Sequence, residues 1–201
     1  MLRVGLTGGL ASGKSFVGEA LAGLGCRLLK ADELGHEVLQ PGGSAYEGAV
    51  RAFGPEILDK QGLIVRRRLG GLVFGDPEKL ATLNALVHPA VIAREEEWMR
   101  EAEAADPAGI AVVEAAILVE TGSHRRFQKL VLAVCTPEQQ IERAMKRDGL
   151  SREEVLHRLE RQMPLEEKRN YADYVIDTSG PKAATLEQVR RLYDELRRLT
   201  V

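Results

Sequence analysis

The sequence contains few cysteines and no long apolar run. Its 201 residues include two cysteines, Cys26 and Cys135, each in an apolar context close to a predicted strand. This pattern favours buried thiols in a reducing compartment, and two cysteines so far apart argue against a metal site built on them. No window approaches 18 apolar residues, and no charged-then-apolar leader precedes the first predicted strand. We therefore expect a cytoplasmic protein without a membrane anchor.

The chain also lacks an excess of charge of either sign. Lysine and arginine number 28 and aspartate and glutamate 30, a net charge of -2. Such a balance gives no general attraction to nucleic acid or to a membrane surface, so we expect neither as a partner. Any basic site must be local. The sequence does not indicate an oligomeric state.

One motif holds most of the functional information. Gly8-x-x-x-x-Gly13-Lys14-Ser15 is the phosphate-binding loop pattern, in which glycines let successive N–H groups face an anion. Lys14 supplies a positive charge and Ser15 a hydroxyl for Mg²⁺. We expect a nucleoside triphosphate, ATP, to bind the whole loop: Gly8, Gly9, Leu10, Ala11, Ser12, Gly13, Lys14 and Ser15.

The surroundings of the loop predict a β-loop-α-β unit. Residues 2–6 are typical of a short buried strand, residues 16–24 of a helix and residues 26–30 of a second strand, parallel to the first. Asp32 follows that second strand, where ligands bind in open α/β sheets, and is our candidate general base. It also suits the N-cap of a helix that starts near Glu33, and both roles can coexist.

The next segment has a different character. Residues 33–109 show helical periodicity and turn signals but no clear buried strands, which predicts a helical insertion with an exposed helix over 89–105. Its Arg66-Arg67-Arg68 triplet is typical of a solvated face, but a phosphorylated substrate would also suit such a residue. His88 by itself is more typical of a structural, hydrogen-bonded histidine than of a catalyst.

The remaining chain completes a parallel sheet. Strands are predicted over 110–116, 130–134 and 174–177, and a closing amphipathic helix over 181–199. Capping patterns at Thr136 and Ser151 open two helices. Five strands in all predict an α/β fold of the phosphate-loop NTPase type, a parallel five-stranded sheet flanked by helices. The loop after the last strand, with Gly180, could touch adenine.

The two helices that follow Thr136 are rich in arginine. Gln140, Arg143 and Arg147 share one face of the first helix, apart from its apolar face, and we expect that face to meet ligand. The segment resembles a lid in which Arg143 or Arg147 stabilises charge in the transition state. The alternative is that these arginines simply pair with nearby glutamates on the surface.

Several classes of protein share a phosphate-binding loop. A regulatory GTPase would need Asn-Lys-x-Asp, but neither Asn84 nor Asn170 is followed by lysine. A motor or remodelling ATPase usually has an apolar run that ends in an acid, and Glu114 after Val113 approximates this weakly. A small kinase, with an acid after the second strand and an arginine-bearing lid, fits best. A kinase for a nucleoside, nucleotide or sugar acid and a non-catalytic ATP-dependent switch remain as alternatives.

Many motifs resemble the dephospho-CoA kinase family, nearly from end to end. The matching pieces are Leu6-Thr7-Gly8-Gly9, Ser12-Gly13-Lys14-Ser15, Ala31-Asp32, Pro41-Gly42, Arg67, Leu69, Phe74, Leu83, His88-Pro89, Leu118-Val119-Glu120, Gln140, Arg143, Arg147-Asp148, Arg158, Gln162, the run Ala172 to Asp177, and Gly180.

The resemblance implies transfer of the ATP γ-phosphoryl group to the ribose 3′-hydroxyl of 3′-dephospho-CoA, the last step of coenzyme A synthesis. By it, Asp32 activates the acceptor hydroxyl, and Arg67, His88 and Glu120 bind the acceptor. Lys14, Arg143 and Arg147 act on the phosphates, with Ser15 on Mg²⁺. It also implies three parts: a nucleotide-binding core (1–31, 110–135 and 173–201), an acceptor-binding insertion (32–109) and a lid (136–172).

The sequence departs from the family pattern at several positions. Lys30 replaces the first of two acids, but the second, Asp32, is present. In the loop, Ala11 replaces a glycine and Phe16 a threonine, and neither change removes the Mg²⁺ hydroxyl. Thr178 stands where asparagine is usual, which weakens the expected adenine contact. Two further changes are Ala116 in place of proline and Gln128 in place of aspartate.

Overall fold

The computed structural model describes residues 1–73 and 75–200, and the chain divides into two compact units. One unit comprises residues 1–30 and 99–201 and the other residues 31–98. Phe74, one of the residues that carry the family resemblance, lies outside the described residues. The predicted division into core, insertion and lid is a division by function, and it stays a prediction.

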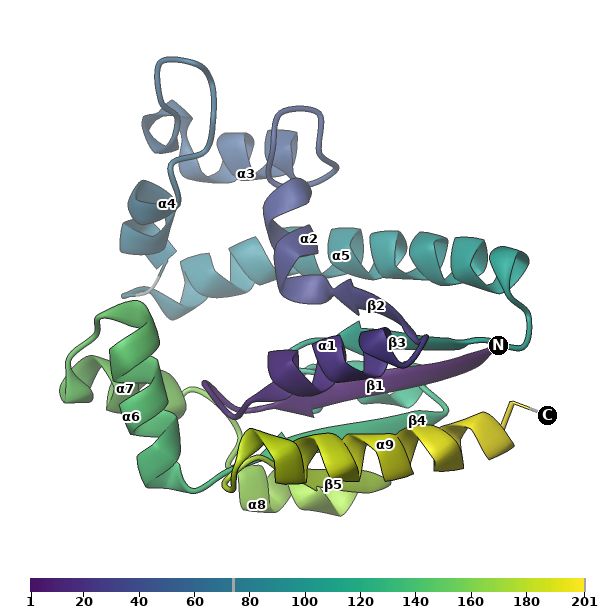
Figure 1. Cartoon of the computed structure of the whole chain (residues 1–201). Helices are drawn as coiled ribbons and strands as arrows, with labels where there is room; N and C mark the ends of the chain where they lie inside the picture. The colour runs from purple at the N-terminus through teal and green to yellow at the C-terminus, as the bar shows by residue number, and fades with distance from the viewer. Residues whose placement is uncertain (74, 201) are drawn as a thin grey trace. The chain divides into compact units, whose positions relative to one another are not determined.

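The first unit is built on a five-stranded parallel sheet with strand order β2-β3-β1-β4-β5 (Figure 1). The strands are β1 (Leu2–Gly8), β2 (Arg27–Lys30), β3 (Ile110–Glu114), β4 (Lys129–Val134) and β5 (Tyr174–Asp177). In β1, β3 and β4 nearly every residue is buried, as expected for central strands covered on both faces. The predicted strand count and direction are confirmed.

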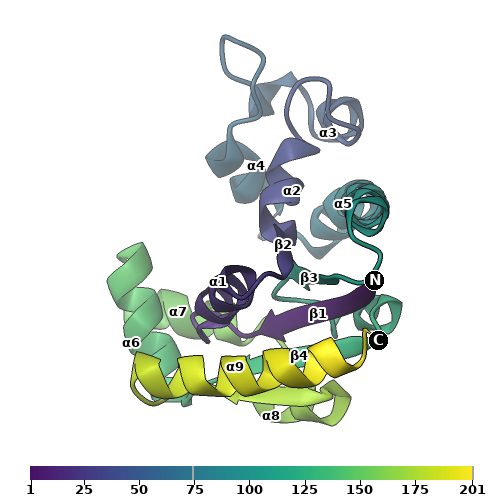
Figure 2. The same cartoon turned by 45° about the vertical axis from the view of Figure 1, so that its right-hand side comes forward.

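Helices of this unit cover the sheet and extend beyond its edge. They are α1 (Lys14–Gly23), α6 (Pro137–Asp148), α7 (Arg152–Leu159), α8 (Leu165–Lys168) and α9 (Lys182–Arg198), with short 3₁₀ turns η2 (Ser123–Arg126) and η3 (Arg169–Tyr171). Helices α1 and α9 lie side by side on one face of the sheet (Figure 2). Their apolar stripes and the strands form one core, to which Leu21 of α1, Leu192 of α9 and Val4 of β1 all belong. This packing holds α1 against the sheet, and with it the end of the loop that leads into α1.

Two predicted capping boxes are confirmed. Thr136 and Ser151 each accept a hydrogen bond from the backbone N–H three residues on, and Gln139 and Glu154 reciprocate. These contacts satisfy N–H groups that the first turn of a helix leaves without partners. Helices α6 and α7 therefore begin where the sequence patterns predicted.

The second unit is helical, as predicted. It contains α2 (Ala31–Glu37), α3 (Tyr46–Phe53), the 3₁₀ turn η1 (Pro55–Ile57), α4 (Arg66–Val73) and the first part of α5 (Pro77–Ala105). Ala49, Phe53, Ile57 and Leu69 belong to its own small core.

Helix α5 begins at Pro77, earlier than the predicted helix over 89–105. The side chain of Asp76 accepts hydrogen bonds from the N–H groups of Glu78 and Lys79, both at 3.1 Å, and so caps this start. Pro89 lies inside the helix. The prediction was wrong because a proline inside a helix, which removes one backbone hydrogen bond, has the same local signature as a proline at a helix start.

Candidate nucleotide and acceptor sites

The phosphate-binding loop joins β1 to α1 at the carboxyl edge of the sheet. Two of its residues have left-handed backbone conformations, Ala11 with φ 53° and Gly13 with φ 85°. Alternation of ordinary and left-handed residues turns successive N–H groups toward one point and makes an anion-binding concavity. Ala11 therefore has a backbone conformation that glycine adopts more readily, at a position where the family pattern usually has glycine.

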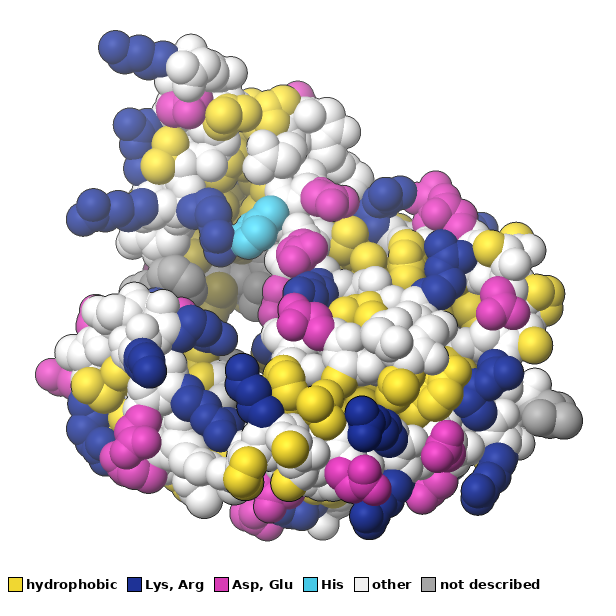
Figure 3. All heavy atoms as spheres, viewed as in Figure 1, with side chains coloured by type: hydrophobic (Ala, Val, Ile, Leu, Met, Phe, Trp, Pro, Cys, Tyr) yellow, Lys and Arg dark blue, Asp and Glu magenta, His cyan; other side chains and the backbone are white. Residues whose placement is uncertain are grey.

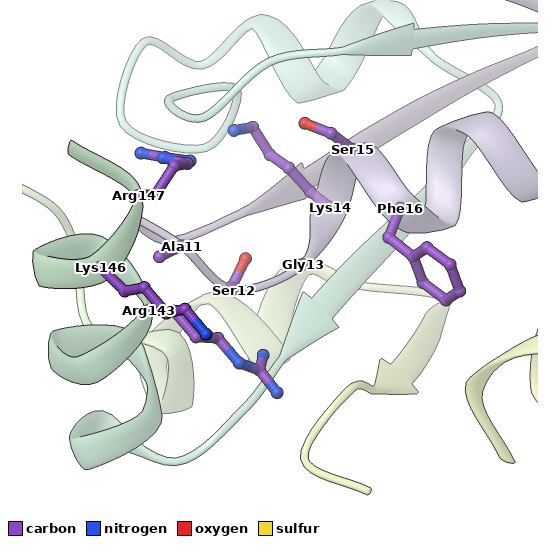
Figure 4. Close-up of a pocket in the computed structure, with 9 residues that line it drawn as sticks. All are labelled: Ala11, Ser12, Gly13, Lys14, Ser15, Phe16, Arg143, Lys146 and Arg147. Carbon is purple, nitrogen blue, oxygen red and sulfur yellow. The ribbon is translucent and has the colours of Figure 1, made fainter. Parts of the chain in front are cut away.

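A pocket with a volume of about 320 Å³ opens beside this loop. Figure 4 shows the loop on one side and the side chains of α6 on the other. The lining residues are Ala11, Ser12, Gly13, Lys14, Ser15, Phe16, Arg143, Lys146 and Arg147. The structure thus brings together the predicted loop residues from Ala11 to Ser15 and both predicted lid arginines, whereas Gly8, Gly9 and Leu10 are not among the residues that line this pocket. Figure 3 shows further lysine and arginine side chains over α6 and α7.

Glu114 provides an acid at the end of β3, next to the first turn of α1. Ser15 Oγ donates to Glu114 Oε1 at 2.5 Å, and Lys14 Nζ lies 3.9 Å from the same oxygen. Glu114 is only 3% exposed, and its Oε2 has no hydrogen-bond partner in the part of the chain that the structure describes. The sequence signal for Glu114 was weak, because the four apolar residues of its strand are followed by glutamate, where the usual pattern has aspartate.

These two side chains suit a magnesium ion. A buried carboxylate oxygen without a partner, beside a serine hydroxyl, is a hard oxygen donor set of the kind that Mg²⁺ prefers. Among residues 1–73 and 75–200, no three His, Cys, Asp or Glu side chains gather as a metal site. An ion held here would therefore take its other ligands from phosphate oxygens and water.

The two lid arginines already have partners. Arg143 donates to the carbonyl oxygen and Oγ1 of Thr178 at 2.7 and 3.1 Å. Arg147 donates to both carboxylate oxygens of Asp148 at 2.7 and 2.9 Å, and this bidentate contact holds the pKa of Asp148 below its ordinary value. Both arginines line the pocket. Arg147 pairs with a neighbouring acid, much as the alternative interpretation expected, whereas Arg143 does not. Elsewhere in the segment, Arg152 and Arg169 pair with Glu138 and Glu166, as that alternative predicted.

The loop after β5 reaches the phosphate-binding loop through Thr178. Thr178 Oγ1 donates to the carbonyl oxygen of Ser12 at 2.8 Å. Gly180 is exposed two residues further on. Thr178, noted in the sequence as a departure from the family pattern, therefore contacts the loop itself, and adenine contact by Gly180 stays a prediction.

In the second unit, the predicted acceptor residues lie on three helices. Asp32 is exposed in the first turn of α2. The positive end of the helix dipole stabilises a carboxylate at this position. Since α2 begins at Ala31, the N-cap role for Asp32 is wrong. His88 lies within α5 and is half-buried, and Arg67 belongs to α4.

The arginine triplet separates into different roles. Arg68 donates to the carbonyl oxygens of Glu56, at 3.3 Å, and of Leu58, and so joins α4 to the segment around η1. Arg66 and Arg67 are exposed at the start of α4. Of the three, Arg68 thus has a structural partner, and Arg67 remains the candidate for acceptor binding.

Glu120, the remaining acceptor candidate, belongs to the first unit. Its Oε1 accepts from Lys168 Nζ at 2.8 Å and from the Met163 N–H at 3.1 Å. Lys168 was missed from the sequence because Glu166-Glu167-Lys168-Arg169 is typical of an exposed charged turn. In the structure it is fully buried, and this burial lowers the pKa of its ammonium group.

One prediction about α6 was wrong. Gln140 shares a face of α6 with Arg147, as the spacing predicted, but it is 6% exposed and its amide lies against the phosphate-binding loop, so it is not free to meet ligand. Three- and four-residue spacing places side chains on a face of a helix but does not tell which face meets another segment.

Both cysteines are buried and unpaired, as predicted. Burial raises the pKa of Cys26 to about 12 and raises the pKa of Cys135, so both stay protonated and unreactive near neutral pH. Within the described residues, no helix combines the length and the apolar character needed to cross a membrane.

Comparison with known proteins identifies the family. Residues 2–183 match the model of the dephospho-CoA kinase family. The chain belongs to this family. A relative from Aquifex aeolicus named dephospho-CoA kinase is 41% identical over 198 residues, which cover 98% of this chain and 99% of the relative.

Solved structures agree with this family assignment. Protein TT1252 from Thermus thermophilus is 36% identical with a TM-score of 0.82, and the match covers 97% of each chain. The dephospho-CoA kinase from Campylobacter jejuni is 27% identical with a TM-score of 0.66, and the match covers 96% of each chain. A shikimate kinase from Bacteroides thetaiotaomicron, 16% identical with a TM-score of 0.52, shares the fold alone.

Family membership confirms the predicted fold class and enzyme class. The chain is a phosphotransferase of the dephospho-CoA kinase family, and the family implies ATP as donor and a small molecule as substrate. The prediction of a kinase rather than a non-catalytic switch is thereby confirmed.

Proposed function

We propose that this chain transfers the γ-phosphoryl group of ATP to the ribose 3′-hydroxyl of 3′-dephospho-CoA, with the phosphate-binding loop as donor site and Asp32 as base. The observation that carries the proposal is a loop of the phosphate-binding geometry that faces basic side chains of α6, in a chain that matches the family over residues 2–183. We place the reaction in the cytoplasm, in keeping with two buried free thiols.

The donor is held mainly by backbone. The N–H groups from Ala11 to Ser15 bind the β and γ phosphates, whereas the Leu10 N–H donates to Gln162 Oε1 at 2.8 Å. Lys14 adds a positive charge at the end of the loop. Arg143 and Arg147 neutralise charge in the closed state, Arg147 by exchanging Asp148 for phosphate. Gly180 contacts the adenine.

Ser15 and Glu114 hold Mg²⁺ beside the loop. Their oxygens are already in contact, and the second Glu114 oxygen is buried without a partner among the described residues. When bound, Mg²⁺ neutralises charge on the phosphate oxygens. The role of this chain is to fix the two oxygen donors next to Lys14.

The acceptor is handled by side chains. Asp32 accepts the proton of the 3′-hydroxyl while the oxygen of that hydroxyl forms the new bond to the γ phosphorus. The bond from that phosphorus to the β,γ-bridging oxygen breaks, and ADP leaves. Arg67 binds an anionic group of the acceptor, and His88 and Glu120 contribute further contacts.

One assay tests this function against its rivals. ADP release is measured with dephospho-CoA and, in separate reactions, with adenosine, AMP and gluconate. We expect turnover with dephospho-CoA only. Turnover with one of the other acceptors would assign the chain to a nucleoside, nucleotide or sugar-acid kinase instead. No turnover with any acceptor would contradict the proposed reaction.

A further inference from the structure

Side chains from later in the chain donate hydrogen bonds to backbone carbonyl oxygens of the phosphate-binding loop. Alternate carbonyl oxygens of the loop each accept a hydrogen bond from one side chain. The pairs are Gly8 O with Lys168 Nζ at 3.1 Å, Leu10 O with Gln140 Nε2 at 2.8 Å, and Ser12 O with Thr178 Oγ1 at 2.8 Å. Because these oxygens point away from the anion site, none of the three side chains needs to touch the nucleotide.

Leu10 is held at both of its backbone polar groups. Its N–H donates to Gln162 Oε1 at 2.8 Å, while its carbonyl oxygen accepts from Gln140. The two glutamines come from different segments, one from α6 and the other from the segment between α7 and α8. Backbone chemistry therefore fixes which atom of each amide faces the loop: Gln140 must donate and Gln162 must accept.

These side chains are buried and closely fitted. Lys168 is 0% exposed, and Gln140 and Thr178 are each 6% exposed. A Cβ on Gly9 would lie 2.4 Å from Gln140 Nε2. A larger residue at position 9 would therefore push the Gln140 amide away from its place beside the Leu10 carbonyl oxygen.

Each held carbonyl orients an N–H group of the loop. In a trans peptide, the C=O and the N–H of the following residue point in opposite directions. Fixing the oxygens of Gly8, Leu10 and Ser12 outward therefore fixes the N–H groups of Gly9, Ala11 and Gly13 in the opposite direction. Ala11 and Gly13 are the two left-handed residues, whose conformations persist when surrounding contacts determine them.

We infer that Gln140, Gln162, Lys168 and Thr178 are positioning residues that hold the loop in its phosphate-binding conformation before the nucleotide arrives. This inference rests on the proposed function, because it assumes that a triphosphate binds the loop. It assigns the predicted lid, residues 136–172, a second role. Besides covering the nucleotide, this segment sets the shape of the loop that binds the phosphates. Preset N–H groups bind phosphate without the cost of ordering the loop.

The two glutamines allow a matched test. Gln140→Glu replaces a donor by a carboxylate that faces the Leu10 carbonyl oxygen, whereas Gln162→Glu retains an acceptor for the Leu10 N–H. Both variants add one negative charge near the same loop residue. Gln128→Glu adds the same charge elsewhere, where Gln128 Oε1 accepts from the Arg3 N–H at 2.8 Å.

Binding of ATP and of AMP to these variants is measured by isothermal titration calorimetry from pH 5.5 to 8. Loss of a buried hydrogen bond to the loop predicts that Gln140→Glu binds ATP roughly 10- to 100-fold more weakly at pH 8, with a smaller loss for Gln162→Glu. AMP, which has no β or γ phosphate, should be affected much less. Gln128→Glu should match the unmodified protein.

The pH dependence separates positioning from general destabilisation. In the Gln140→Glu variant, protonation of the introduced carboxylate creates an O–H donor to the Leu10 carbonyl oxygen. The ATP affinity of this variant should therefore recover toward that of the unmodified protein as the pH falls. Equal ATP affinity in Gln140→Glu and Gln162→Glu, or equal losses for ATP and AMP, would overturn the inference. If the unmodified protein itself failed to bind ATP, the proposed function would fail instead.

A second pair keeps the test open if Gln140→Glu does not fold. Thr178→Ser keeps the hydroxyl donor to the Ser12 carbonyl oxygen, and Thr178→Val keeps the shape without the hydroxyl. The valine variant also removes one acceptor of Arg143, but Arg143 keeps its shorter contact, to the Thr178 carbonyl oxygen, in both variants. We expect the serine variant to retain ATP affinity and the valine variant to lose roughly 5- to 10-fold. Equal affinities in the two variants would contradict the positioning role.

Discussion

In the proposed reaction, the phosphate-binding loop and the helical unit over 31–98 differ in the groups that they offer to the donor and to the acceptor. The loop presents backbone groups, and buried side chains behind it hold those groups in place. The helical unit presents exposed side chains, Asp32 on α2 and Arg67 on α4, and α4 packs into a separate small core through Leu69. A donor common to many kinases can be bound by a general backbone motif, whereas a particular acceptor needs side chains that differ between kinases.

This comparison predicts that single substitutions in the two regions change different kinetic constants. Changes in the loop should alter ATP binding and turnover together. Changes on the helical unit should alter acceptor chemistry or acceptor binding and leave ATP affinity intact.

The largest effect is expected at Asp32. Asp32→Asn removes the proposed base, so kcat should fall by roughly 10² to 10⁴ while the ATP dissociation constant stays nearly the same. Steady-state kinetics and an ATP titration on one preparation measure both. Glu33→Gln, at the neighbouring exposed carboxylate, is the control and should keep full activity. Normal turnover by Asp32→Asn would show that another group is the base.

Lys14 tests the donor side of the comparison. Lys14→Ala removes the charge at the end of the loop, and kcat/KM for ATP should fall by roughly 10² to 10³. Lys129→Ala is the control, since Lys129 pairs with Asp173 at the start of β4. Unaltered kinetics in Lys14→Ala would exclude the phosphate-loop interpretation.

Arg67 tests the acceptor side. Arg67→Ala should raise KM for dephospho-CoA roughly 10- to 100-fold through loss of a charge-assisted contact, without a change in KM for ATP. Arg68→Ala should instead lower the melting temperature, since Arg68 donates to backbone carbonyl oxygens of Glu56 and Leu58. If Arg67→Ala raised KM for ATP as well, the separation between the two regions would fail.

The smallest effect concerns the loop after β5. Asp177 Oδ1 accepts from the Ser179 N–H at 2.7 Å, and hydrogen bonds from Ser179 hold the pKa of Asp177 below its ordinary value of 3.8. A depressed carboxyl pKa stabilises the fold fully above the unfolded value, and this contribution is lost as the pH falls through the folded pKa.

Asp177→Asn should therefore make the melting temperature slightly less sensitive to pH below about 4, relative to the unmodified protein. Thermal unfolding between pH 3 and 6 measures the difference. A variant with the same acid sensitivity as the unmodified protein would show that Asp177 does not contribute.

Most of the fold was predictable because its signals are local. Apolar runs indicated the strands, and the capping boxes at Thr136 and Ser151 indicated where two helices begin. The loop motif and Asp32 followed from patterns within a few residues. The internal Pro89 misled the prediction of α5, because proline at a helix start and proline within a helix look alike in sequence.

The contacts behind the loop were not predictable in the same way. Lys168 and Gln140 lie 160 and 130 residues along the chain from their loop partners. A polar residue whose partner is a backbone carbonyl leaves no pattern in sequence, since every residue carries that carbonyl. Their burial was visible only once the chain was folded.

The position of the transferred phosphate tests the proposed reaction most directly. The protein is incubated with ATP and dephospho-CoA, and the product is examined by ³¹P NMR with proton correlation. We predict one new phosphomonoester signal that correlates with the ribose 3′ proton, and equimolar ADP. A phosphomonoester on another hydroxyl, or ADP release without a phosphorylated acceptor, would contradict the proposed reaction.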